Sequence, residues 1–134
     1  MGIDNLDPMK ESFFVMKRWM ENRNQNKYIA DYFNRYGYSK IGIYGAGDVG
    51  RLTYLELKDT NVKIVFFVDR NGEGLIDIDS IPVISVMNLI EDHCDKIDAL
   101  LVTPLGNYGS ICRLLSKNIP ELPVLSLKDV VNEL

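Results

Sequence analysis

The chain has 134 residues, of which 46% are hydrophobic and 25% are charged, and its net charge is −4. This length suffices for one domain with a core of its own. The negative charge argues against nucleic acid as a partner, because that binding requires clustered Lys and Arg to neutralise phosphates. No apolar run approaches the ~20 residues that cross a membrane, and residues 1–7 lack the apolar stretch of a secretory signal.

The cysteines and the histidine leave little room for metal or triad chemistry. Cys94 and Cys112 lie far apart and in no metal-binding spacing. We expect reduced thiols and therefore a cytoplasmic protein. His93 is the sole histidine, and we expect it at the surface, at the end of a helix. The sequence thus predicts no metal site and no catalytic residues.

Residues 1–38 are expected to form an N-terminal helical segment with two helices. In the first, Asp7 and Pro8 match the N-cap and first helical positions. Its apolar face, read from spacings of four, three and four, holds Met9, Phe13, Met16 and Met20. After a polar stretch at residues 22–26, the second helix has the apolar residues Ile29, Tyr32, Phe33 and Tyr36. Gly37 then stands where a glycine ends a helix.

Residues 39–134 show short apolar runs that alternate with amphipathic helices. The expected strands are residues 41–44, 63–68, 82–84, 98–103 and 123–125, with a loop at residues 69–80. The apolar residues of the expected helices are Val49, Leu52 and Leu55, then Leu89 and Ile90 after a Ser85 cap, then Ile111, Leu114 and Leu115. A last helix opens with a capping-box pattern at residues 126–129.

This alternation predicts an α/β fold with right-handed crossovers and a doubly wound parallel sheet. The expected order of the five strands is 3-2-1-4-5, preceded by the two N-terminal helices. The first strand is then central, and a ligand crevice is expected at its carboxyl end.

A glycine-rich turn follows the first expected strand and opens a helix. Its residues are Gly45, Ala46, Gly47, Asp48, Val49 and Gly50, a G-x-G-x-x-G motif. Asp69 stands at the end of the second expected strand, directly after residue 68 and nineteen positions after Gly50, where an acid can bind the hydroxyls of a ribose. In this Rossmann-type setting Gly45 permits the tight turn, Gly47 lets the backbone approach a phosphate and Gly50 allows close helix–strand packing. The alternative is that the turn serves packing alone.

Two features argue against an ordinary dinucleotide enzyme. Asp48 lies in the first helical turn, where its carboxylate repels a pyrophosphate, and Arg51 offsets this only in part. About 95 residues follow Ser39. This length corresponds to about one mononucleotide-binding half of a Rossmann fold and two further strands, and it leaves no residues for a substrate domain.

The turn after the fourth expected strand is a second candidate ligand-binding surface, at the same edge of the sheet. Thr103 and Pro104 begin it, and Asn107 and Tyr108 could bond a sugar or a base. An ordinary strand–helix connection is the equal alternative. Together with the glycine turn, Asp69 and Arg70, Thr103 and Pro104 complete the predicted binding residues.

Four stretches, residues 41–50, 65–70, 81–85 and 99–104, resemble small Rossmann-like domains of bacterial polysaccharide-biosynthesis and sugar-modifying proteins. They are similar to the N-terminal domain of sialic-acid-type sugar acetyltransferases and to the C-terminal domain of sugar C-methyltransferases. A looser likeness extends to CoA- and NAD-binding domains of redox-sensing repressors. The resemblance implies that residues 45–50 and Asp69 bind a nucleotide or nucleotide-sugar. The acetyltransferases' catalytic histidine belongs to a separate β-helix domain without a counterpart in these residues.

Three functions follow from the sequence. The first is a nucleotide- or nucleotide-sugar-binding accessory domain that serves surface polysaccharide biosynthesis and has no catalytic centre of its own. The second is the cofactor domain of an NAD(P)-linked oxidoreductase, with Asp69 favouring NAD and Arg70 weakening that preference. The third is a dimerisation domain with a vestigial pocket.

The first helix is expected to dock on a second copy of the chain or on a neighbouring biosynthetic enzyme. Phe14, Val15 and Trp19 extend its apolar surface beyond what one core contact needs. In the competing account, the helix lies across the sheet edge and is buried mostly within its own chain.

Overall fold

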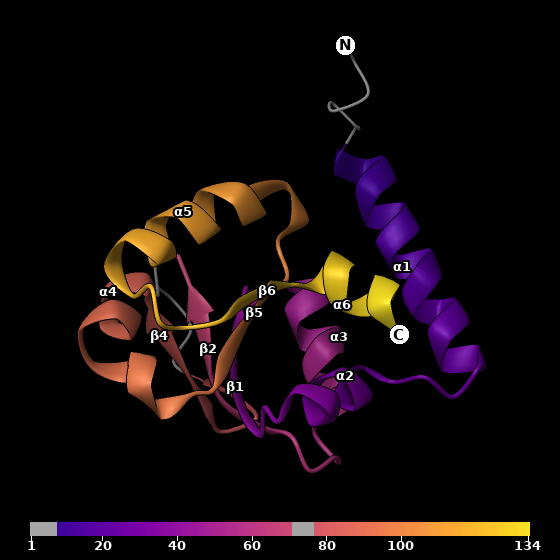
Figure 1. Cartoon of the computed structure of the whole chain (residues 1–134), viewed down its shortest axis with the longest axis horizontal. Coiled ribbons are helices and arrows are strands. Elements are labelled where there is room, and N and C mark those ends of the chain that lie inside the picture. Colours follow the sequence, from indigo (N-terminus) through magenta and orange to yellow (C-terminus); the bar gives the residue numbers. More distant parts are fainter. Residues whose placement is uncertain (1–7, 71–76) are drawn as a thin grey trace.

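The computed structural model describes residues 8–70 and 77–134, and these form a sheet covered by helices on both faces (Figure 1). The helices are α1 (Pro8–Asn24), α2 (Ile29–Tyr36), α3 (Asp48–Leu57), α4 (Val86–Asn88), α5 (Tyr108–Asn118) and α6 (Leu127–Glu133). The strands are β1 (Lys40–Tyr44), β2 (Lys63–Asp69), β3 (Asp77–Ile78), β4 (Ile81–Ser85), β5 (Ala99–Val102) and β6 (Val124–Ser126).

The sheet has the order β3-β4-β2-β1-β5-β6, and all neighbouring strands are parallel except β3 and β4. The α/β class with a mostly parallel sheet is confirmed. The predicted order of five strands, 3-2-1-4-5, is corrected, because a sixth strand lies within the segment expected to be a loop. Asp79 and Ser80 take positive φ angles of 50° and 68°, which turns the chain tightly enough for Ile78 to pair with Ile81. β1 lies between β2 and β5, so its carboxyl end is central.

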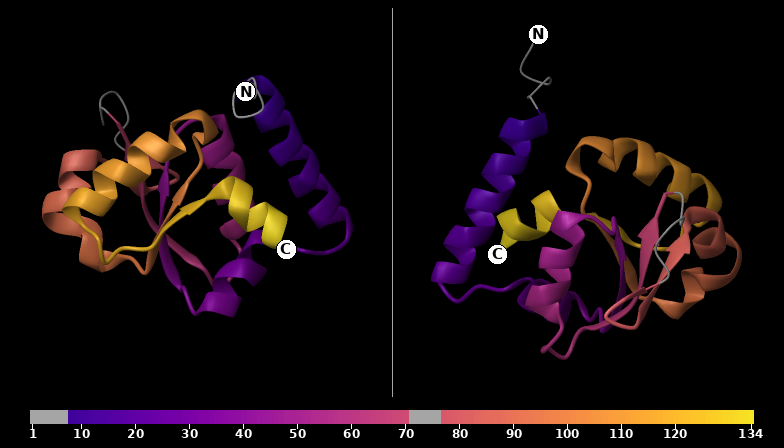
Figure 2. Two further views of the ribbon diagram at one scale, coloured as in Figure 1. Left: turned by 45° about the horizontal axis from the view of Figure 1, so that its top comes forward. Right: turned by 180° about the vertical axis from the view of Figure 1, so that it is seen from behind.

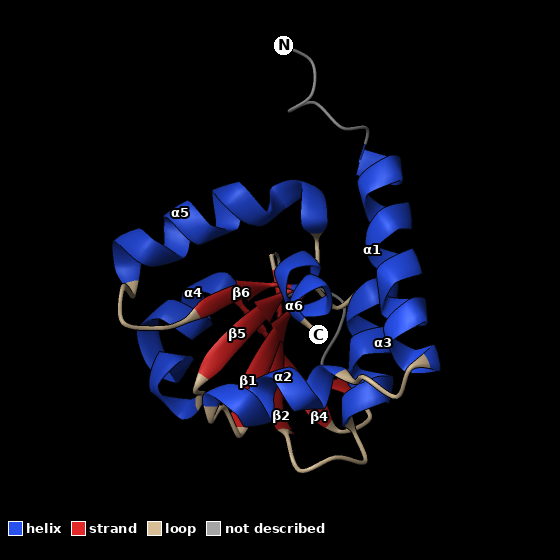
Figure 3. Ribbon diagram, turned by 45° about the vertical axis from the view of Figure 1, so that its right-hand side comes forward, coloured by secondary structure: helices blue, strands red, loops and turns tan. Residues whose placement is uncertain are grey.

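Two hydrophobic cores flank the sheet, because successive strand residues point to opposite faces. Ile43 and Phe67 pack on the face covered by α2, α3 and α6, whereas Phe66 and Leu100 pack on the face covered by α4 and α5. Figure 2 shows these two groups of helices from two further sides, and Figure 3 shows the strands between them.

Three predicted helix ends are confirmed. Gly37 follows α2 in the left-handed conformation, with φ 76°. The hydroxyl of Ser85 accepts a hydrogen bond from the Asn88 amide at 3.1 Å, and that of Ser126 accepts one from the Asp129 amide at 3.0 Å. The helix after Ser85 is shorter than expected, because α4 gives way to a π-helical turn at Leu89–His93.

The sequence misplaced the buried face of α3. Leu52 and Leu55, which were expected to line the core, are both exposed. The buried residues are Gly50, Thr53 and Leu57. The small side chains of Gly50 and Thr53 let the helix approach the sheet closely. This steric requirement, rather than the hydrophobicity of its residues, determines which face of α3 is buried.

Helix α1 also turns a different face to the protein from the predicted one. Val15 and Trp19 are buried, whereas Phe13, which was expected on the core face, is 62% exposed. The helix lies along α6 (Figure 1), where the Asn22 side-chain amide donates to the Val131 carbonyl oxygen at 2.8 Å. Trp19 therefore belongs to the core of its own chain, and α1 packs on another helix rather than across the sheet edge.

The carboxylate of Glu56 links α1 and α2 to α3. Its side chain is only 3% exposed. It accepts hydrogen bonds from the Trp19 indole N–H at 2.8 Å, the Arg23 guanidinium at 2.7 Å and the Ile29 amide at 2.8 Å. These three donors satisfy a charge that would otherwise be costly to bury.

We predict that Glu56→Ala lowers the free energy of unfolding by about 3 kcal/mol, because it leaves two buried N–H donors without an acceptor. Urea denaturation followed by Trp19 fluorescence measures this. The matched control is Glu133→Ala, whose partners Arg35 and Tyr36 are exposed, and it should cost less than about 1 kcal/mol. Equal effects of the two substitutions would contradict the role of Glu56.

Candidate functional site

The glycine turn joins β1 to α3 at the centre of the sheet edge. Gly45 has φ 109°, a conformation that L-residues with a side chain rarely adopt. A Cβ at this position would also collide with the Thr103 hydroxyl oxygen. The Gly45 amide donates to the Val68 carbonyl oxygen at 2.8 Å, which fixes the turn to the end of β2.

The other two glycines of the motif, Gly47 and Gly50, differ in whether packing excludes a side chain at their positions. A Cβ on Gly50 would overlap the carbonyl oxygen of Gly45, so close packing excludes a side chain there. Gly47 has φ −86° and is exposed, and no atom of the described residues lies within 4 Å of where its Cβ would be. Packing against the described residues therefore accounts for Gly45 and Gly50 and leaves Gly47 unexplained.

Charges of both signs lie at the start of α3. Gly47 is the N-cap and supplies no side-chain hydrogen bond. The exposed carboxylate of Asp48 lies in the first turn, where it interacts favourably with the helix dipole. The Arg51 guanidinium folds back and donates to the Ala46 carbonyl oxygen at 3.3 Å, which keeps a positive charge beside the turn.

A cavity of about 460 Å³ opens beside this turn, on the face of the sheet covered by α4 and α5. Its volume lies within the usual range for small-molecule sites. Its lining residues come from the carboxyl ends of β1 and β2 and the residues after them, from the connection between β5 and α5, and from α4 and α5: Tyr44, Gly45, Asp69, Arg70, Val86, Met87, Pro104, Asn107, Ser110, Ile111 and Leu114.

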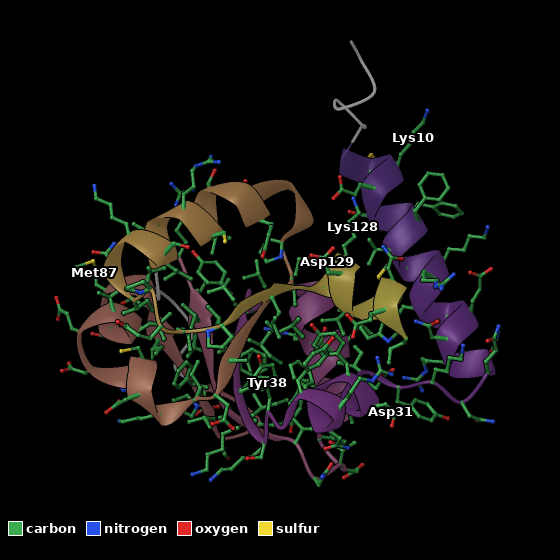
Figure 4. The ribbon with its side chains drawn as sticks, viewed as in Figure 1. Lys10, Asp31, Tyr38, Met87, Lys128 and Asp129 are labelled. Carbon is green, nitrogen blue, oxygen red and sulfur yellow. The ribbon has the colours of Figure 1, made fainter. Side chains whose placement is uncertain are left out.

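The lining combines charged and apolar groups. Asp69 is the last residue of β2, and Arg70 follows it. Met87 of α4 and Leu114 of α5 are exposed apolar residues of the lining, and Figure 4 places Met87 at the side of the molecule opposite α1. A cavity with apolar walls and a few polar groups suits a ligand that has a flat apolar ring and a hydroxylated or charged portion.

The structure brings only some of the predicted binding residues to the cavity. Gly45, Asp69, Arg70 and Pro104 line it. Gly47 and Asp48 are exposed in the adjoining turn, whereas Ala46, Val49 and Gly50 are buried or partly buried. Thr103 is buried, and its hydroxyl donates to the Tyr44 carbonyl oxygen at 2.8 Å, so it ties β5 to β1. For all of these residues, contact with a ligand stays a prediction.

Several lining residues were missed by the sequence reasoning. Tyr44 was assigned only to the buried first strand, and Val86 and Met87 of α4 were not singled out in the helix expected after Ser85. On α5, Ser110, Ile111 and Leu114 recur at helical spacing, a signal that could have indicated a face shared between core and cavity. Asn107 lines the cavity as the sequence suggested, whereas the Tyr108 hydroxyl donates to the Val124 carbonyl oxygen at 3.2 Å.

Other kinds of site find no support in the described residues. Within residues 8–70 and 77–134, no three His, Cys, Asp or Glu side chains are placed to hold a metal ion. No helix in the same ranges is long and apolar enough to span a bilayer. Cys94 and Cys112 are free thiols, and the His93 Nδ1 lies 3.0 Å from the Asn88 carbonyl oxygen.

Comparison of the sequence with models of known protein families finds no match, and comparison with curated proteins finds no significant relative. The proposal of a function therefore rests on the cavity and the glycine turn. The residues that line the cavity are those that a bound ligand can contact.

We predict that the glycines of the turn respond differently to the same added methyl group. Gly50→Ala should lower the free energy of unfolding by about 2 kcal/mol or more, because its Cβ overlaps the Gly45 carbonyl oxygen. Gly47→Ala should change it by less than about 0.5 kcal/mol, because its Cβ meets open space. Thermal and urea denaturation of both variants measure this. Comparable destabilisation would show that Gly47 has a packing role after all.

Proposed function

We propose that this chain is a Rossmann-like accessory domain that binds a nucleotide or nucleotide-sugar in bacterial surface-polysaccharide biosynthesis and has no catalytic centre of its own. The observation that carries the proposal is the cavity at the carboxyl edge of the sheet. It adjoins a glycine turn in which packing against the described residues does not require Gly47. Ligands of open α/β sheets bind at this edge.

The lining suggests how such a ligand lies in the cavity. The Asp69 carboxylate, at the end of β2, accepts hydrogen bonds from ribose hydroxyls. The base lies between the apolar side chains of Met87 and Leu114, both of which line the cavity. The phosphates then extend past Gly45 toward the exposed turn, where Gly47 lets them approach the backbone.

The charges around the turn bear on which ligand binds. Asp48 repels an anion at the start of α3, whereas Arg51 and Arg70 attract it. An NAD(P)-linked cofactor domain is the alternative reading of the same site. Asp69 then disfavours the 2′-phosphate of NADP.

A thermal-shift panel of NAD, NADP, CoA, UDP- and GDP-sugars and S-adenosylmethionine tests the proposal. We expect a UDP- or GDP-sugar to stabilise the protein by about 2.7 kcal/mol at 100 times its dissociation constant.

Gly47→Val should abolish this shift without unfolding the protein, because a side chain there blocks the phosphate. Asp48→Asn should strengthen binding by roughly 0.3–1 kcal/mol. A panel without any shift would contradict nucleotide binding and favour a vestigial pocket.

A second candidate function, docking to another protein, rests on the apolar surface that α1 and α3 leave exposed. Met9, Phe13 and Met20 of α1 are exposed. A groove of about 380 Å³ between the two helices is lined by Met16, Trp19, Met20, Arg23, Leu52 and Leu55. Exposed apolar patches of this kind mark interaction sites. A second copy of the chain is the simplest occupant, and a neighbouring biosynthetic enzyme is the other.

We predict a dimer in solution that Phe13→Glu converts into a folded monomer, because the charge enters the apolar contact. Analytical ultracentrifugation over a range of concentrations measures this. Leu114→Glu is the control: this residue is also exposed, but it lies on α5 and lines the cavity, so the dimer should persist. A wild-type protein that is monomeric at high concentration rules out self-association.

A further inference from the structure

Tyr44 is a buried residue at the edge of the cavity. It is the last residue of β1 and is 6% exposed. Its ring packs in the core beneath α4 and α5, and Tyr44 is one of the residues that line the cavity. Hydrophobic packing explains the ring but does not explain the hydroxyl.

The hydroxyl of Tyr44 has no hydrogen-bond partner among the residues that the structure describes. Other tyrosines of the chain do bond through this group: Tyr36 to Glu133, Tyr54 to Asp79 and Tyr108 to the Val124 carbonyl oxygen. Polar groups inside proteins are nearly always hydrogen-bonded. In the described part of the chain no side-chain polar atom is both fully enclosed and unpaired, so the Tyr44 oxygen is not fully enclosed, and Tyr44 lines the cavity.

A positively charged side chain, Arg70, and a negatively charged one, Asp69, both act on this hydroxyl. Burial raises the pKa of Tyr44, Arg70 lowers it and Asp69 raises it. Tyr44 is therefore a neutral hydrogen-bond donor at physiological pH, within the field of both charged side chains. Asp69 and Arg70 line the same cavity.

These three groups offer complementary chemistry to one kind of molecule. An ionised Asp69 only accepts hydrogen bonds, whereas the Arg70 guanidinium only donates them, and the Tyr44 hydroxyl can also donate. A ribose 5′-phosphate carries hydroxyl donors for the carboxylate and anionic oxygens for the two donors. Hydrogen bonds to charged acceptors are the stronger class.

We propose that the Tyr44 hydroxyl and Arg70 bind the phosphate next to the ribose, and that the site therefore selects ribonucleoside 5′-phosphates over free nucleosides. This inference rests on the proposed nucleotide binding and adds the groups that recognise the first phosphate. It gives that phosphate a place away from Asp48, and a second phosphate reaches the turn at Gly47. The Tyr44 hydroxyl, which has no partner among the described residues, is then hydrogen-bonded in the bound state.

Titration calorimetry with UDP, ADP, uridine and adenosine tests the proposal on wild-type protein and Tyr44→Phe. Tyr44→Phe keeps the ring and breaks no hydrogen bond within the described chain, so the unliganded melting temperature should not change. We expect this variant to weaken the binding of the better diphosphate about tenfold or more, and that of its nucleoside less than twofold. Arg70→Gln, at an exposed position, should show the same selective loss.

The control is Tyr108→Phe, which removes a hydroxyl that bonds the backbone and does not line the cavity. It should leave both affinities unchanged. Unaltered diphosphate binding by Tyr44→Phe would overturn the role of Tyr44 and leave nucleotide binding standing. An equal loss for diphosphate and nucleoside would overturn the phosphate contact. Wild-type protein that binds neither diphosphate would contradict nucleotide binding and this inference with it.

Discussion

Helix α3 is held at both ends, and these two contacts fix the glycine turn and the N-terminal helices. At its start, Gly50 lies so close to the Gly45 carbonyl oxygen that a side chain cannot fit. At its other end, Glu56 accepts three hydrogen bonds from α1 and from the start of α2. The first contact sets the edge of the cavity, and the second determines which face of α1 is buried. The turn and the exposed α1 face thus depend on one short helix.

The strands were predictable because their apolar runs are bounded by polar residues and turns. The buried faces of α1 and α3 could not be predicted, because the hydrophobicity of a residue does not determine which element it packs against. Leu52 and Leu55 have the spacing of a core face, yet steric fit at Gly50 turns them outward. Trp19 looked like surplus apolar surface, yet Glu56, thirty-seven positions away, accepts its N–H. β3 has only two residues, too few to give a sequence pattern.

The candidate site was predictable where it depends on local backbone geometry and not where distant elements meet. The motif located the turn, and Asp69 ends β2 as expected. The cavity itself arises because α4 and α5 bring Met87 and Leu114 to the same space, and no local pattern shows that meeting. Tyr44 was missed because an aromatic residue at the end of an apolar strand resembles an ordinary core residue.

The proposed function requires that a nucleotide occupies the cavity beside the glycine turn. The most direct test follows backbone amide chemical shifts of isotopically labelled protein during titration with a UDP-sugar. The account predicts that the largest changes lie at Gly45, Gly47 and Arg70 and in the first two turns of α5. Changes confined to α1 and α3, or no changes at millimolar ligand, would contradict it.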